Sequence, residues 1–133
     1  MAAQDPDHRV YTLYQQGRSQ LEEGDPLGAA AALEEALAQQ SADRQAEKAS
    51  LHEVLGRAYF ASSQIQRARA EFEHALALDP SNDYAHYSVG RCYERQGRLS
   101  DAAKHFKIAN ALADRGLYKT ALTRVLTRLG RLR

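Results

Sequence analysis

The chain has 133 residues, of which 44% are hydrophobic and 26% are charged. This length suits one compact domain with an apolar core and excludes a large multidomain enzyme. No stretch approaches the run of about 18 apolar residues that crosses a membrane, and the single cysteine, Cys92, excludes an internal disulfide. The opening MAAQDPDH is unlike a secretory signal because no apolar stretch follows it, so we expect a cytoplasmic protein.

The formal net charge of +1 hides an uneven distribution along the chain. Residues 1–114 hold 12 basic residues and all 17 acidic ones, whereas residues 115–133 hold six basic residues and no acidic one. A segment with this excess of positive charge can attract phosphate groups. The C-terminal segment is therefore an alternative candidate for binding nucleic acid or an anionic membrane surface.

A polar arm is predicted over residues 1–9, followed by a first helical hairpin over residues 10–43. In this hairpin small and apolar residues recur at spacings of three and four, which is typical of helices that pack on one face. About five extra residues lie in the polar stretch Gln40–Lys48. They predict either a longer loop or an extra turn on the following helix, with Ser41 or Asp43 as its N-cap.

Two further hairpins are predicted over residues 49–82 and 83–116, which are 34 residues each and follow one another without a gap. Each has two amphipathic halves separated by turn residues, and one such hairpin cannot bury its whole apolar face alone. The first hairpin is a more diverged copy of the same unit. Aligning the second and third copies pairs His52 with His86, Gly56 with Gly90, Tyr59 with Tyr93, Ala68 with Ala102, Phe72 with Phe106 and Ala75 with Ala109.

This pattern of glycine, aromatic and alanine positions resembles the tetratricopeptide repeat (TPR) family, and in particular a short bacterial-type member with three repeats. The resemblance implies an all-α fold, a right-handed superhelix of antiparallel helical hairpins. Three TPR units would span residues 10–116. Residues 117–133 predict a basic amphipathic helix that caps the last hairpin, with Leu117, Leu122, Val125, Leu126 and Leu129 on one side, which makes about seven helices in all.

Catalysis is not indicated by the residues that could carry it. His52 and His86 fall on separate first helices, and His74 and His105 fall beside the core aromatics. The sequence contains no Gly-rich phosphate loop, no nucleophile elbow and no Cys/His spacing typical of metal ligands. Cys92 follows a basic residue but is expected to pack inside a first helix. We therefore expect no enzyme activity, no metal and no cofactor.

The resemblance implies that the first helix of each unit lines a concave groove, which binds an extended peptide or a partner helix of another protein. One inward position holds arginine in all three copies, and tyrosines flank it, so we expect an acidic or aromatic partner segment. The alternative is that these arginines pair with Glu22, Glu53 or Glu94 and only solvate the groove. The predicted groove residues are Tyr11, Tyr14, Arg18, Glu53, Arg57, Phe60, Tyr84, Tyr87, Arg91 and Arg95.

One known ligand of the family is disfavoured by the residues present. Members that hold the acidic C-terminal tail of heat-shock chaperones use a clamp of Lys, Asn and Arg side chains. At the corresponding positions this chain has Tyr14, Arg18, Val54, Tyr84 and Ser88, so a chaperone tail is not the expected partner. A homodimer through the uncapped first hairpin is a further alternative.

Overall fold

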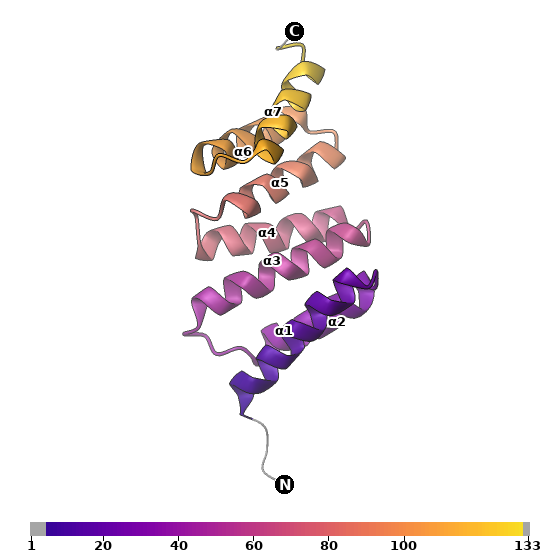
Figure 1. Ribbon diagram of the computed structural model, residues 1–133, viewed down its shortest axis with the longest axis vertical. Helices are drawn as coiled ribbons and strands as arrows, with labels where there is room; N and C mark the ends of the chain where they lie inside the picture. Colours follow the sequence, from indigo (N-terminus) through magenta and orange to yellow (C-terminus); the bar gives the residue numbers. More distant parts are fainter. Residues whose placement is uncertain (1–4, 132–133) are drawn as a thin grey trace.

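Seven helices make up the part of the chain that the computed structural model describes, residues 5–131, and no strand occurs among these residues. Consecutive helices form antiparallel hairpins that stack along the long axis of the molecule (Figure 1). The predicted all-α fold of stacked helical hairpins is confirmed. The helices are α1 (Pro6–Glu22), α2 (Pro26–Gln39), α3 (Gln45–Ala61), α4 (Ile65–Leu78), α5 (Asp83–Arg95), α6 (Leu99–Leu112) and α7 (Gly116–Arg128).

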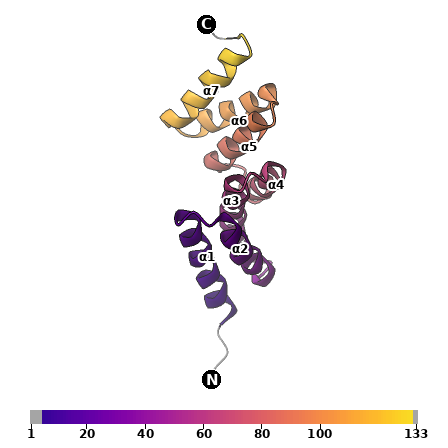
Figure 2. The ribbon, with the colours of Figure 1, turned by 90° about the vertical axis from the view of Figure 1, so that its right-hand side faces the viewer.

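The stack is curved rather than straight. Within it α1 pairs with α2, α3 with α4 and α5 with α6, and each second helix also contacts the first helix of the next hairpin. Figure 2 shows α1 and α7 displaced to one side of the long axis and α4 and α6 to the other. The first helices α1, α3 and α5 lie close enough together to line one hollow.

Glycine allows the two helices of each hairpin to approach closely. A Cβ atom added at Gly56 would lie 2.7 Å from the ring of Phe72, and one added at Gly90 would lie 2.5 Å from Phe106. In the first hairpin Gly17 plays the same part, and Leu33 replaces the aromatic ring. Because these distances are shorter than any ordinary contact, a larger residue would push the helices apart.

The turn inside each hairpin needs one residue in the left-handed region of backbone conformation. Gly24 and Gly97 occupy this position in the first and third hairpins, with φ of 82° and 76°. The second hairpin has Ser63 there, with φ of 63°. A serine in this conformation is strained, whereas glycine adopts it freely.

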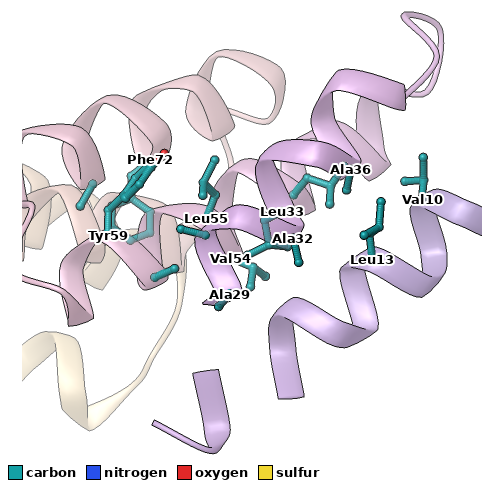
Figure 3. Packing of buried hydrophobic residues seen from close by; sticks show 14 of the residues in the cluster. Val10, Leu13, Ala29, Ala32, Leu33, Ala36, Val54, Leu55, Tyr59 and Phe72 are labelled. Atoms are coloured by element: carbon teal, nitrogen blue, oxygen red, sulfur yellow. The ribbon is translucent and has the colours of Figure 1, made fainter. Parts of the chain in front are cut away.

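Two clusters of buried side chains form the core. The larger one joins α1 to α5, and Figure 3 shows part of it, where Leu33 and Ala36 of α2 lie between Leu13 of α1 and Leu55 of α3. The second cluster joins α5, α6 and α7 around Tyr118, which is completely buried. Each hairpin thus buries its apolar surface against its neighbours, as stacked repeats require.

The N-terminal end differs from its prediction. Helix α1 begins at Pro6, so residues 6–9, which were assigned to a polar arm, form its first turn, and residues 1–4 lie outside the described part of the chain. Asp5 is the N-cap and its side chain accepts a hydrogen bond from the backbone N–H of Asp7. Proline in the first helical position suits this start, because it has no N–H to leave unpaired there.

The extra residues between the first and second copies add a turn to α3, which begins at Gln45. The predicted N-caps Ser41 and Asp43 are wrong: Arg44 holds that position and no side chain caps the helix. Nη2 of Arg44 instead lies 2.5 Å from Oδ2 of Asp7 in α1. A contact between hairpins therefore fixes the start of α3, where the sequence suggested a local cap.

The predicted cap at the C-terminal end is present as α7. Tyr118, Ala121 and Val125 are buried, and polar residues such as Thr123 and Thr127 face solvent. Leu117 was predicted on the apolar side, but 49% of its surface is exposed. Among the described residues α7 packs against α6 and α5 through Tyr118, Ala121 and Val125, and Leu117 lies outside this contact. No helix among residues 5–131 has the length and apolar character to cross a bilayer.

Candidate functional site

Three equivalent arginines project from the first helices of the hairpins: Arg18 from α1, Arg57 from α3 and Arg91 from α5. All three are exposed. They occupy the same place in each repeat, immediately after the glycine that packs against the second helix. The close packing on one side of each helix therefore leaves the arginine pointing away from the core.

A hollow of about 290 Å³ lies between α1, α3 and α5. Four of the predicted groove residues meet there: Arg57, Phe60, Tyr84 and Arg91. We name it the arginine hollow. Its full lining is Leu21, Glu22, Arg57, Phe60, Ala61, Phe72, Tyr84, Ser88 and Arg91.

The side chain of Phe60 orders two guanidinium groups of α5. The Cζ atom of Arg91 lies 4.5 Å from the centre of the Phe60 ring, and that of Arg95 lies 5.4 Å away. A cation over a ring face is attracted by the electrons of the ring, and the stacked side chain loses less freedom when it binds a ligand. Arg18 makes a looser contact, 5.7 Å from the ring centre of Tyr14.

A second hollow of about 290 Å³ lies between the N-terminal halves of α1 and α3. Two further predicted groove residues, Tyr11 and Tyr14, form part of its wall. We name it the tyrosine hollow. Its full lining is Asp7, Val10, Tyr11, Tyr14, Gln40, Arg44, Glu47, Ser50 and Leu51.

The acidic residues of the groove are engaged with other partners. Glu94 accepts two hydrogen bonds from Arg124 of α7, at 2.7 and 2.8 Å, and these bonds hold the pKa of its carboxyl below the usual value. Glu53 accepts a hydrogen bond of 2.9 Å from Asn82. Among residues 5–131 no ion pair includes any of the groove arginines, which are Arg18, Arg57, Arg91 and Arg95.

Two predicted groove residues are not on the open surface. Only 6% of Tyr87 is exposed, and its ring packs against those of Phe106 and Tyr118 at 5.7 and 5.2 Å. The prediction of Tyr87 as a surface contact is therefore wrong, because the stacking of α7 on α5 covers it. Glu53 is half-buried and directed to Asn82.

The sequence reasoning missed several wall residues of both hollows. Asp7, Gln40 and Arg44 line the tyrosine hollow from the start of α1 and from the connection between α2 and α3. The repeat pattern does not predict that these residues line a hollow, because their positions depend on how the hairpins stack. Ser88 was considered only as a clamp position, although it lines the arginine hollow.

The histidines pair within hairpins and away from both hollows. Nδ1 of His52 lies 2.6 Å from Oε2 of Glu71, and Nδ1 of His86 lies 3.3 Å from Nδ1 of His105. Burial and the neighbouring charge of His86 lower the pKa of His105. In the described part of the chain no three His, Cys, Asp or Glu side chains are grouped so that they could hold a metal ion.

Cys92 lies in the core of the stack. It is completely buried, and burial raises the pKa of its thiol to about 12. The nearby arginines act in the opposite direction but do not overcome the effect of burial. The thiol is therefore protonated at neutral pH, which agrees with a packing role.

The sequence profile described as "Tetratricopeptide repeat" matches residues 14–61 and 53–116, which together cover more than half of the chain. The chain belongs to the tetratricopeptide repeat family. No curated protein gives a significant match to this TPR chain over its sequence.

Several solved structures, among them named TPR domains, share its fold. The Arabidopsis OM64 TPR domain superposes with a TM-score of 0.85 at 19% identity, covering 92% of this chain and 98% of that one. The first TPR domain of Spaghetti (RPAP3), bound to the HSP90 peptide SRMEEVD, has a TM-score of 0.84 at 18% identity, covering 92% of this chain and 94% of that one. MamA has a TM-score of 0.83 at 20% identity, covering 92% of this chain and 69% of that one. At these identities the likeness concerns the fold alone.

Proposed function

We propose that this TPR chain is a non-catalytic interaction module whose concave groove binds a peptide segment of another protein. Membership of a family of interaction scaffolds supports the proposal. Two similar TPR domains were solved in complex with chaperone peptides, SRMEEVD of HSP90 and SGPTIEEVD of HSP70. They support protein partners in general and do not name the partner of this chain.

The observation that carries the proposal is the arginine hollow. Arg57 and Arg91 line it, and neither forms an ion pair with another described residue. The guanidinium group of Arg91 stacks on the ring of Phe60. Glu22 is the one acidic residue of the lining, so the hollow has an excess of positive charge. Its best ligand is a carboxylate of the partner, and a shielded charged hydrogen bond contributes about 1.5–3 kcal/mol.

The chaperone tail is a poor ligand for this groove. Val54 and Ser88 stand where the clamp of chaperone-binding members needs longer polar side chains, and both are buried, with 4% and 5% of their surface exposed. Valine has no polar group for a terminal carboxylate, and the short hydroxyl of Ser88 cannot replace the longer polar side chain of the clamp. We propose that the partner carries an internal acidic or aromatic segment instead.

Ion pairs within the stack weaken the alternative of a phosphate-binding C-terminal helix. Arg124 and Arg128 both lie near Glu94, with closest N···O distances of 2.7 and 3.8 Å. Arg115 lies 3.9 Å from Asp83. These basic residues therefore neutralise acidic residues of α5, which reduces what they offer to a phosphate.

Affinity capture from an extract of the source cells, read by mass spectrometry, tests the proposal. We compare the wild type with Arg57→Glu/Arg91→Glu and with the control Lys107→Glu/Lys119→Glu, which reverses two exposed charges outside the groove. Circular dichroism verifies that each variant is folded. We expect a small set of proteins that the wild type and control retain and the arginine variant loses, since losing one charged contact weakens binding about tenfold or more. An identical catch from all three proteins would refute the groove as the binding site.

A further inference from the structure

We infer that the groove selects an extended segment with two anchors: an aromatic side chain in the tyrosine hollow and a carboxylate in the arginine hollow, four residues apart. This inference rests on the proposed function and adds the pattern that the partner must carry. It follows from the chemistry of the two hollows and from the distance between them.

The tyrosine hollow suits an uncharged aromatic side chain. Tyr11, of which 60% is exposed, and the half-buried Tyr14 offer ring surfaces beside Val10 and Leu51. The charges of Arg44 and Asp7 at its rim neutralise each other in an ion pair of 2.5 Å. Rings that pack edge to face or offset against tyrosine gain about 0.5–1.5 kcal/mol beyond the burial of their area. Glu47, also in the lining, disfavours an acidic group there.

The two hollows are separated along the same pair of helices. The tyrosine hollow uses residues 7–14 of α1 and 47–51 of α3, whereas the arginine hollow uses residues 21–22 of α1 and 57–61 of α3. On each helix the two linings are therefore about ten residues apart, and a helix rises 1.5 Å per residue, which gives about 15 Å between the hollows along the axes of α1 and α3. Both helices give a similar distance, so the estimate does not depend on one of them.

The distance between the hollows matches the distance between two side chains of an extended peptide at one sequence spacing. An extended chain advances about 3.3 Å per residue and directs alternate side chains to the same face. Residues i and i+4 then lie on one face about 13 Å apart, and their side chains span the remaining distance. In a helical ligand the nearest pair on one face with a similar separation is i and i+11, at about 16 Å.

Polar groups on the walls favour the extended form. Gln40 and Ser50 line the tyrosine hollow, and Glu22 and Ser88 line the arginine hollow. An extended segment brings backbone N–H and C=O groups that need partners, and these side chains can supply them. A helix satisfies its own backbone and would cover these groups with its apolar face, at a cost in free energy.

Fluorescence anisotropy with labelled synthetic peptides tests the spacing. The peptides carry one Phe and one Glu in a Ser/Gly background at separations of two, four and six residues, in both orders. A further peptide carries the pair eleven residues apart in an Ala/Lys helical host. We expect the separation of four to bind about tenfold more tightly than two or six in one of the two orders, because only that spacing fills both hollows.

A double-mutant cycle assigns each anchor to its hollow. Tyr11→Ser should remove the advantage of Phe over Ser in the peptide, and Arg57→Gln/Arg91→Gln should remove the advantage of Glu over Gln. Tyr11 is exposed, so its replacement leaves the fold intact, and Lys107→Gln is the control outside the groove. Equal affinity at all spacings, tighter binding of the helical peptide, or no binding of any peptide at millimolar concentration would overturn the inference. The proposed function fails separately, when captured proteins do not depend on Arg57 and Arg91.

Discussion

At the scale of single residues, the arginines at equivalent positions of the three repeats make different contacts. Arg91 stacks on Phe60, whereas Arg18 contacts Tyr14 more loosely, and Arg57 forms part of the arginine hollow. The glycine that precedes each arginine makes the same kind of packing contact in all three hairpins. In every hairpin a side chain of the second helix fills the space where its Cβ would be.

The glycine positions give a prediction for stability. Gly56→Ala places a methyl group 2.7 Å from the Phe72 ring and should lower the free energy of unfolding by about 1–3 kcal/mol, because the core is overpacked. The gain of about 1 kcal/mol in helix propensity offsets part of this loss. Urea unfolding measures the difference. Gly116→Ala is the matched control, since nothing lies within 4 Å of the added Cβ; a loss of equal size there would contradict the packing argument.

At the scale of helices, α7 has two contacts that hold it on the stack. Tyr118 is buried, and its hydroxyl donates a hydrogen bond of 2.5 Å to Asp83 at the start of α5. Arg124 forms a two-pronged pair with Glu94 at the end of the same helix. The two contacts fix both ends of α5 against α7, so α7 acts as a cap in addition to covering apolar surface.

Removing the second contact should loosen α7 selectively. Arg124→Ala leaves the carboxylate of Glu94, whose side chain is 14% exposed, without its closest partner. Because Arg124 itself is 45% exposed, we expect a loss of only about 1 kcal/mol. Hydrogen exchange should report faster exchange in α7 and unchanged protection in α3 and α4. The control Lys119→Ala, at an exposed site of the same helix, should change neither; equal acceleration in both variants would rule out the ion pair as the cause.

At the scale of the whole molecule, the uneven charge of the sequence has a structural use. The basic C-terminal segment lies on α5, where Arg115 meets Asp83 and Arg124 meets Glu94. The excess of positive charge at one end of the chain is thus partly neutralised within the stack. The free energy of unfolding should depend on pH, because Glu94 and His105 of the third hairpin have shifted pKa values.

Two groups set the direction of this pH dependence. The pKa of His105 is lowered by burial and by His86, and that of Glu94 is lowered by Arg124. A lowered pKa means that the unfolded chain binds the proton more readily, so stability is lost as pH falls. The first loss should begin below the usual histidine pKa of 6.5 and the second below the usual glutamate pKa of 4.5.

Urea unfolding at pH 7.5, 5.5 and 4.0 measures both steps. His105→Gln should lose less stability than the wild type between pH 7.5 and 5.5, and Glu94→Gln should lose less between pH 5.5 and 4.0. Asp101, whose charge raises the pKa of His105, and Lys104, whose charge lowers it, are present in both proteins and do not alter the comparison. If His105→Gln follows the wild type through the first step, the partly buried pair of His86 and His105 is not the cause of the loss.

The sequence by itself determined the repeat and therefore the fold. A period of 34 residues, with glycine, aromatic and alanine side chains at fixed places, admits few ways of burying its apolar faces, and stacked hairpins are the way that the structure takes. The column of arginines could also be predicted, because residues at equal positions in a repeat share a face. The start of α1 was not predicted, although Asp5 as N-cap and Pro6 as first helical residue are local signals for a helix start.

Only the tertiary structure decided which of these residues stay accessible and what they meet. The spacing of Tyr87 in the repeat predicts a groove position, but α7 covers its side chain. Glu94 could have paired with the groove arginines, but it accepts a hydrogen bond from Arg124 instead. The tyrosine hollow depends on the connection between α2 and α3, which lies outside the period. Periodicity fixes the direction in which a side chain leaves its helix, whereas exposure, charge pairing and hollows depend on the neighbouring hairpin, whose contacts are far away in sequence.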